Sequence, residues 1–175
     1  HPGKLTFASG GNGNSLHIAG ELFKSVAGIN MLHVPFKGNV PALTAVVSGE
    51  VDLIFSAASP VLPLAKAGKL RLLGVSTKKR LVGLEDVPTI AESGLPQYEM
   101  SSWYGIFAAG RTPPDLASRI SSEVNKALGV QQVRDQMLRQ GIQPTGGTPA
   151  EYQKFISSEL AKWGNVIKAA NIKVD

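Results

Sequence analysis

The sequence predicts an α/β fold in which a mostly parallel sheet is covered by helices. Short apolar runs of strand length alternate with helical patterns through the first half of the chain. The strand runs are almost continuously apolar, which is typical of strands buried on both faces of a parallel sheet. The second half differs, because helical patterns there follow one another.

Four strands and three helices are expected along the first half. The strands are 5–8, 31–34, 51–55 and 70–76, and the helices are 15–27, 41–48 and 59–68. Pro41 begins its helix, where a missing N–H has no cost. The second half begins with an extended run over 98–109, which is expected to add a strand.

Three further helices are expected after this run. Thr112 is interpreted as the N-cap of the first, followed by one apolar face at helical spacing: Leu116, Ile120, Val124 and Leu128. The second helix covers 130–140. Thr148 and Glu151 form a capping box before the third, whose apolar stripe is expected to be core: Tyr152, Phe155, Ile156, Leu160, Trp163 and Ile167.

The chain is expected to divide into an α/β lobe over 1–103 and a C-terminal segment over 104–175. The helices of that segment would leave wide apolar faces bare if the segment stood alone. Hydrophobic residues make up 43% of the chain and charged residues 18%. The charged share lies below the roughly one quarter of an average globular protein, which argues against disorder.

The composition also excludes several classes of protein. The net charge is +5, but the only run of three basic residues, 78–80, has no aromatic residues interleaved with it. Nucleic acid is therefore not an expected partner. Cysteine is missing, which excludes thiolate metal sites and disulfides. No apolar run approaches the ~20 residues of a membrane span, no signal peptide is visible, and His1 in place of methionine suggests a processed or truncated chain.

The most informative stretch is ASGGNGNSLHIAGELF, residues 8–23, which runs from a strand through a glycine- and asparagine-rich loop into a helix. The first N–H groups of that helix lack partners within it, and glycines let a ligand approach the backbone. Side-chain hydrogen-bonding groups come from Ser9, Asn12, Asn14 and Ser15. This combination predicts an anion-binding loop that includes Gly10 and Gly13. The alternative is a plain capped turn.

The loop does not match the common nucleotide motifs. A Walker motif requires a lysine that is missing here, and Ser15 and Leu16 follow Asn14. A Rossmann fingerprint requires a third glycine, which is also missing.

Other residues are expected at the same edge of the sheet, because the carboxyl ends of parallel strands meet there. Lys37 and Gly38 follow the second strand, and Ser56 and Ala57 follow the third. His17 lies one turn into the first helix. The alternative to a binding role is that Lys37 is simply solvated. For His17 it is a histidine that is packed in the core or lies on the surface.

The sequence favours binding without catalysis, with no cofactor and no metal. It has no G-x-S-x-G motif, its three histidines lack metal-ligand spacing, and Glu21 is the acidic residue nearest the loop. A carboxylate- or phosphate-handling enzyme is an alternative that would need a base near the loop. A small-molecule sensor domain is another, although no DNA-binding helical unit is visible.

Several segments, in order, resemble one receptor family. By residue number they are 8–13 (ASGGNG) with His17, 19–24 (AGELFK), 33–38 (HVPFKG), 65–71, 87–89 with 94–96, 102–105 (SWYG), 123–128 and 162–163. On these segments the chain resembles the solute receptors of tripartite tricarboxylate transporters, the Bug family. The resemblance covers essentially the whole chain.

The resemblance implies a periplasmic-binding-protein-like fold of type II, with two lobes and a ligand between them. Such a receptor captures a small carboxylate, such as a dicarboxylate or an aromatic acid, and delivers it to membrane transporter subunits. Backbone amides of the glycine loop would hold one carboxylate. The ligand-binding residues expected here are Ser9, Gly10, Asn12, Gly13, Asn14, Ser15, His17, Lys37, Gly38, Ser56 and Ala57.

Two departures from the family pattern matter. Family members are much longer, and residues 104–175 normally pack on an N-terminal half-lobe that is missing here. A homodimer through this orphaned segment is one hypothesis. The family often has Phe-Asp-Asn where this chain has Phe55-Ser56-Ala57, so a ligand without an ammonium group is expected.

Overall fold

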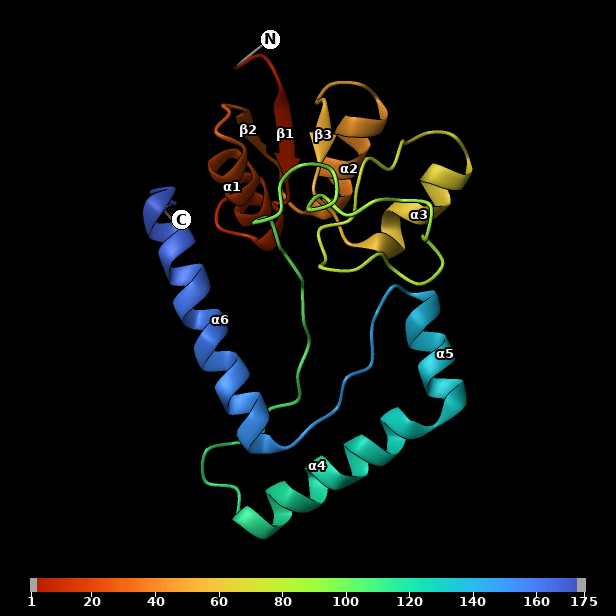
Figure 1. Cartoon of the computed structure of the whole chain (residues 1–175), viewed down its shortest axis with the longest axis vertical. Helices are drawn as coiled ribbons and strands as arrows, with labels where there is room; N and C mark the ends of the chain where they lie inside the picture. Colours follow the sequence, from red (N-terminus) through yellow and green to blue (C-terminus); the bar gives the residue numbers. More distant parts are fainter. Residues whose placement is uncertain (1–2, 173–175) are drawn as a thin grey trace. The chain divides into compact units, whose positions relative to one another are not determined.

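The computed structural model describes residues 3–172 of the chain. Its first half contains a three-stranded parallel sheet with the strand order β2-β1-β3 (Figure 1). The strands are β1 (Thr6–Ser9), β2 (Leu32–Pro35) and β3 (Leu53–Ile54). The predicted α/β class is confirmed, and three of the four strands expected in the first half are present.

All six expected helices are present in the described part of the chain, with ends shifted by a few residues. They are α1 (Ser15–Ala27), α2 (Asn39–Val47), α3 (Ala58–Lys66), α4 (Pro114–Gly129), α5 (Gln131–Arg139) and α6 (Pro149–Ala169). The first three each follow a strand, so all three begin at the carboxyl edge of the sheet.

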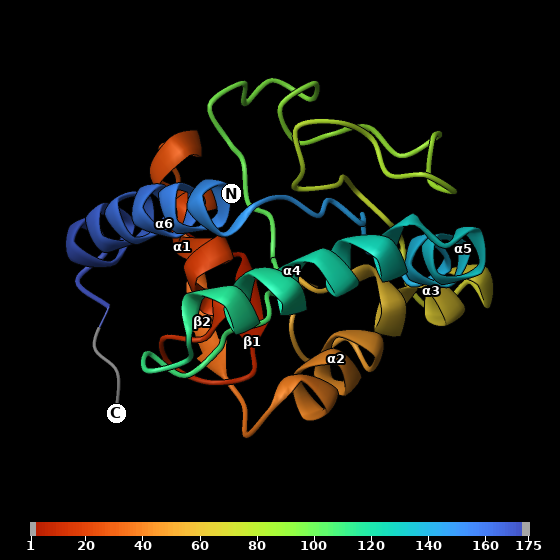
Figure 2. The same cartoon turned by 90° about the horizontal axis from the view of Figure 1, so that it is seen from below.

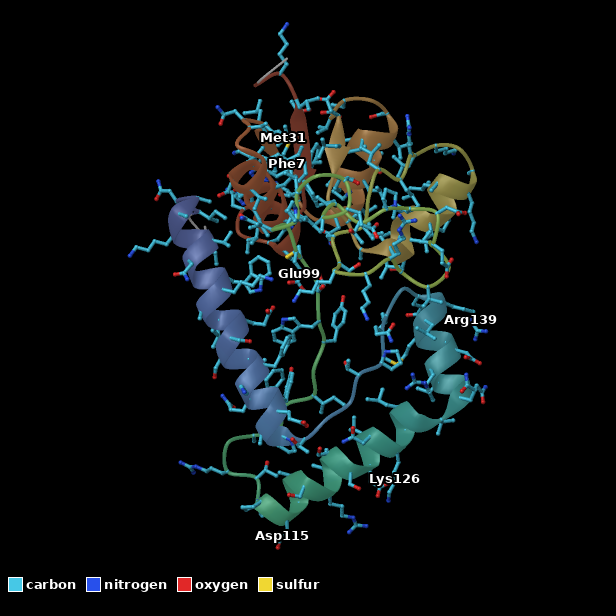
Figure 3. The ribbon with its side chains drawn as sticks, viewed as in Figure 1. Phe7, Met31, Glu99, Asp115, Lys126 and Arg139 are labelled. Carbon is cyan, nitrogen blue, oxygen red and sulfur yellow. The ribbon has the colours of Figure 1, made fainter. Side chains whose placement is uncertain are left out.

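Helices cover both faces of the sheet, and successive residues of β1 point to opposite faces. Ala8 is fully buried on the α2 face, in a cluster with Ala42, Ala45 and Val51. Phe7 is fully buried on the α1 face, where its ring lies near the ring of His17. Figure 3 shows Phe7 among the side chains of this core.

Helix α1 packs closely on β1 at one glycine, Gly20. A Cβ atom at Gly20 would overlap the ring of Phe7. Glycine at this position therefore lets the helix backbone rest directly on a large buried ring. This close packing holds α1 against β1.

The prediction of a fourth strand over 70–76 is wrong. Only Val75 makes a bridge, a parallel one with Thr89, in which Val75 N–H donates to Pro88 and Ile90 N–H donates to Val75. An extended segment becomes a strand only where a neighbour supplies a ladder of hydrogen bonds, and no described strand runs alongside 70–74. The extended run over 98–109 likewise contains no strand.

The chain divides into two compact units, His1–Ser102 with Gly164–Asp175, and Trp103–Trp163. The first unit holds the sheet and α1 to α3. The second holds α4, α5 and most of α6. That residues 104–175 belong to another lobe stays a prediction.

Within the second unit, α4 leads directly into α5, with Val130 between them (Figure 2). Figure 3 shows Asp115 near the beginning of α4 and Lys126 towards its end, which suits the helix dipole. The amide of Asn125 exchanges two hydrogen bonds of 2.9 Å with the backbone of Gly147. This pair attaches the segment before α6 to α4.

The helices of the second unit expose apolar faces, as expected for 104–175 alone. No described residue of α4, α5 or α6 is buried. Leu116 is 49% exposed, Phe155 40% and Leu160 71%. Of the six stripe residues predicted as core, none is buried in the described chain: Phe155 and Leu160 are exposed and the other four are half-buried. The rings of Trp103 and Phe107 pack against Tyr152, and Trp103 also packs against Phe155.

The two predicted helix caps had different outcomes. Thr112 is not the N-cap of α4, since Pro113 takes that position in an extended conformation. Capping from Thr112 would require Pro113 to be helical immediately before Pro114, which sterically disfavours that conformation. The capping box is confirmed: Thr148 N–H donates to the Glu151 carboxylate at 2.8 Å, and Glu151 N–H donates to the Thr148 hydroxyl at 3.2 Å.

Candidate functional site

The candidate site lies at the carboxyl edge of the sheet, where the loop after β1 enters α1 (Figure 1). We call residues 10–14 the glycine loop. Because the three strands are parallel, the segments that follow β2 and β3 leave the sheet at the same edge. All residues expected at the site lie in these three segments, in the first turn of α1, or, in the case of Ser9, at the end of β1.

The glycine loop has a backbone that other residues would adopt poorly. Gly11 and Gly13 have φ angles of +137° and +72°, a region that strongly favours glycine. Gly10 has an ordinary φ but no room for a side chain, since a Cβ atom there would overlap the side chain of Asn39 and approach that of Asn14. The glycine at position 10 is therefore explained by close packing, and those at 11 and 13 by conformation.

The loop ends in a capped helix with free donors. The side chain of Asn14 accepts the N–H of His17 at 2.9 Å and so acts as the N-cap of α1. Within residues 3–172, the backbone N–H groups of Ser15 and Leu16 have no acceptor. Two backbone donors thus point from the positive end of the helix dipole.

Two backbone hydrogen bonds join the segment after β2 to the end of β1 and to the glycine loop. Phe36 N–H donates to the carbonyl of Ser9 at 2.9 Å, and Gly38 N–H donates to the carbonyl of Gly10 at 3.1 Å. Helices α2 and α3 begin after Gly38 and Ala57 without a side-chain cap. The amino ends of three helices therefore share one edge, which makes the potential there positive.

His17 supports the glycine loop from within α1. The ring is buried, and its Nδ1 accepts the N–H of Gly13 at 3.1 Å. Its Nε2 lies 3.7 Å from the carboxylate of Glu21, which Lys24 also contacts at 2.7 Å. Burial lowers the pKa of His17 below its usual 6.5; Glu21 opposes this effect and Lys24 adds to it.

His33 supports the loop from β2. Its Nε2 lies 2.6 Å from the hydroxyl of Ser9, which also accepts the N–H of Gly11 at 3.2 Å. The imidazole is stacked on that of His17, with centroids 3.7 Å apart and planes 7° apart. Burial, with a smaller effect of His17, lowers the pKa of His33 to about 4, so both rings are neutral at pH 7.

The structure thus joins most of the expected site residues into one network: Ser9, Gly10, Gly13, Asn14, His17 and Gly38. Asn12 and Ser15 lie in the same loop and first helical turn. The other expected residues are not joined to it. Lys37 and Ala57 are exposed and Ser56 is half-buried, and no hydrogen bond within residues 3–172 links them to the glycine loop.

Two residues at the site were missed from the sequence, His33 and Asn39. The expected start of the second helix at Pro41 left Asn39 in a loop, whereas α2 begins at Asn39. The spacing of His33 from the other histidines argues against a metal site and gives no other signal. The parallel pairing of Phe7 with His33 would have indicated it, since Ser9 lies two residues beyond Phe7 on the same face.

Two kinds of feature are missing from the described residues. No group of three or more His, Cys, Asp or Glu side chains in that part of the chain could hold a metal ion. Among the helices of residues 3–172, none is long and apolar enough to cross a membrane.

Comparison with known proteins gives a consistent family assignment. A family model described as tripartite tricarboxylate transporter family receptor matches residues 1–172. A UPF0065 protein from the tcbD-tcbE intergenic region of Pseudomonas sp. (strain P51) is 38% identical over 168 residues, which cover 95% of this chain and 50% of that protein. A UPF0065 protein from the clcB-clcD intergenic region of Pseudomonas knackmussii is 30% identical, covering 90% of this chain and 94% of that protein.

Solved structures agree with the sequence matches. "R. palustris Rpa4515 with adipate" has a TM-score of 0.87 and 34% identity, covering 98% of this chain and 57% of that one. "MatC (Rpa3494) from Rhodopseudomonas palustris with bound malate" has a TM-score of 0.79 and 27% identity, covering 94% and 57%. The chain spans about half the length of most curated relatives it matches. None of these matches supports the hypothesis of a homodimer.

Proposed function

Because this chain belongs to the tripartite tricarboxylate transporter receptor family, we propose that it is part of a solute receptor that captures a small carboxylate. The receptor passes this ligand to the membrane subunits of a transporter. The ligand is a dicarboxylate or an aromatic acid, and the receptor works in the periplasm. A structural neighbour described as a periplasmic transporter, 34% identical, supports the location.

The observation that carries the proposal is the set of backbone donors at the carboxyl edge of the sheet. The free N–H groups of Ser15 and Leu16 lie beside a loop whose glycines leave the backbone accessible. Helix amino ends stabilise anions, and backbone N–H groups suit the two oxygens of a carboxylate. The ligands named for the two neighbours, adipate and malate, are both dicarboxylates.

The residues after β3 favour a ligand without an ammonium group. Ser56 and Ala57 are uncharged, so this segment offers no carboxylate to pair with an amino group. Glu21 is the acidic residue nearest the loop, and its carboxylate already pairs with Lys24. We therefore expect succinate to bind more tightly than aspartate, which has the same carbon chain and an added ammonium.

The chemistry of the site supports binding over catalysis. The Nδ1 atom of His17 is occupied by the Gly13 N–H, and the Nε2 atom of His33 by the Ser9 hydroxyl. A serine hydroxyl bonded to an imidazole is the arrangement of a nucleophile and its general base, but Ser9 is fully buried, so this pair is not presented to a ligand. The network therefore shapes the loop and leaves the bound carboxylate unchanged.

Isothermal titration calorimetry with succinate, adipate, benzoate, aspartate and phosphate tests the proposal. Binding of a dicarboxylate or of benzoate, with weaker binding of aspartate and phosphate, is the expected result. Binding of phosphate alone would overturn the proposal in favour of a phosphate-handling protein. Turnover of any of these ligands, followed by NMR of the mixture, would overturn the assignment as a receptor.

A further inference from the structure

Two stacked imidazoles, the buried His17 and the half-buried His33, lie beside the glycine loop, and each makes a hydrogen bond to it or to the residue before it. His17 accepts the N–H of Gly13 at 3.1 Å. His33 contacts the hydroxyl of Ser9 at 2.6 Å, and that hydroxyl in turn bonds to the backbone of Gly11. The loop that leads into the proposed carboxylate donors, the N–H groups of Ser15 and Leu16 in α1, is therefore held by histidine nitrogens.

The Gly13 contact determines the tautomer of His17. A backbone N–H can only donate, so Nδ1 must present a lone pair and neutral His17 must hold its proton on Nε2. This proton faces the carboxylate of Glu21, whose Oε1 atom lies 3.7 Å from Nε2. The Nζ atom of Lys24 lies 2.7 Å from the same oxygen. The chain from Lys24 through Glu21 to His17 thus orients the ring for its contact with Gly13.

We propose that His17 is a positioning residue of the carboxylate-binding loop, and that protonation of its Nδ1 in acid releases Gly13 and weakens carboxylate binding. This inference rests on the proposed function. Protonation turns Nδ1 from an acceptor into a donor, so two N–H groups would then face each other. The loop would have to move to separate them, and this movement would change how a carboxylate approaches the Ser15 and Leu16 N–H groups that follow the loop.

The groups packed around His17 disfavour its protonated form. Burial is the largest effect, and the positive charge of Lys24 on α1 acts in the same direction. His33 on β2, stacked at 3.7 Å, would lie face to face with a new charge, and Phe7 on β1 offers no polar group. Glu21 alone favours the charged form. The proton is therefore taken up below pH 6.5.

Linkage gives the proposal a second consequence. If protonation weakens carboxylate binding, then a bound carboxylate must lower the pKa of His17 by the same free energy. A histidine acting as a cationic partner for the ligand would behave in the opposite way. Affinity would then rise in acid, and the ligand would raise the pKa.

Two substitutions separate the positioning role from a general role in packing. In His17→Asn the amide lies near the position of Nδ1, so its oxygen can accept the Gly13 N–H but does not titrate. In His17→Gln the amide lies near the position of Nε2 and leaves Gly13 without a partner. We expect His17→Asn to retain adipate binding without the acid loss, and His17→Gln to bind about tenfold more weakly at pH 7, the effect of one lost hydrogen bond.

The test combines NMR of the wild-type chain with calorimetry. Long-range ¹⁵N spectra should show His17 as the Nε2–H tautomer, and the Gly13 amide should shift with the same midpoint as the His17 ring. Through that midpoint, adipate affinity of the wild type should fall by about tenfold relative to His17→Asn, which corrects for titration of adipate itself. Circular dichroism reports whether each variant is folded.

Three results would overturn the proposal: an Nδ1–H tautomer, a Gly13 amide that does not follow His17, or an affinity that rises in acid relative to His17→Asn. If adipate does not bind the wild type at pH 7, the proposed function has failed for this ligand. The Gly13 titration then still decides whether His17 holds the loop, because it requires neither ligand nor variant.

Discussion

The hydroxyl of Tyr98 donates a hydrogen bond of 3.1 Å to the backbone carbonyl of Ala19, inside helix α1. Tyr98 is 1% exposed, and its ring contacts those of Phe23 and Phe55. Burial raises the pKa of the hydroxyl, which keeps it protonated and able to donate. This contact attaches the segment after the sheet to the helix that forms the candidate site.

Replacing Tyr98 by phenylalanine should therefore destabilise the chain. The carbonyl of Ala19 would lose this partner inside the core, at a cost of about 1 kcal/mol in the free energy of unfolding. Urea unfolding followed by circular dichroism measures the change. Tyr104→Phe is the matched control, because Tyr104 is 82% exposed. Loss of its hydroxyl should have almost no effect on the free energy of unfolding. Equal stability of Tyr98→Phe and wild type would contradict the assigned bond.

Gly20→Ala should disturb the packing of α1 on β1. The new methyl group would overlap the ring of Phe7, and overpacking in a core typically costs about 1–3 kcal/mol. This loss should exceed the gain of about 1 kcal/mol from replacing a helical glycine. Gly164→Ala in α6 is the control, since nothing lies within 4 Å of its added methyl. We expect the urea midpoint to fall for Gly20→Ala and to hold or rise for Gly164→Ala.

Gly13→Asp should abolish carboxylate binding, because it places a negative side chain beside the donors of α1. Asparagine has nearly the same size and also tolerates the φ of +72° at this position, so Gly13→Asn separates charge from shape. Calorimetry with adipate should show measurable binding for Gly13→Asn and none for Gly13→Asp. Wild-type affinity in Gly13→Asp would place the ligand elsewhere.

The capping box of α6 should lose its effect in acid. Hydrogen bonds from the backbone and hydroxyl of Thr148 lower the pKa of Glu151 below 4.5. A lowered carboxyl pKa gives stability that is present above pH 4.5 and is lost as the pH falls through the folded-state value. Glu151→Gln keeps an acceptor but does not titrate. The helical content of the wild type should exceed that of Glu151→Gln at pH 7, and this difference should shrink below pH 4.5; a constant difference would contradict the assignment.

The sequence predicted the α/β class and the helices well, because their signals are local. The spacing of apolar residues and the Thr148–Glu151 capping box depend on neighbours within a few positions. The fourth strand failed for a non-local reason. Apolar residues over 70–76 resemble a strand, but the ladder of hydrogen bonds depends on a partner that the described chain does not place there.

The candidate site was predicted in its position but only partly in its contacts. The glycine loop, Asn14 and His17 are close in sequence, so their grouping could be seen directly. The stacking of His33 on His17 depends on the register of β2 against β1, and the contact of Asn39 with Gly10 depends on the true start of α2. Neither is encoded locally, which is why His33 and Asn39 were missed.

The most direct test of the account is a thermal-shift measurement on the wild-type chain and Gly13→Asp with adipate, malate and phosphate. A ligand at 100 times its Kd should stabilise the folded state by about 2.7 kcal/mol, which raises the Tm by several degrees. The account predicts that a dicarboxylate raises the Tm of the wild type but not that of Gly13→Asp. A shift with phosphate alone, an equal shift in both proteins, or no shift with either dicarboxylate would contradict it.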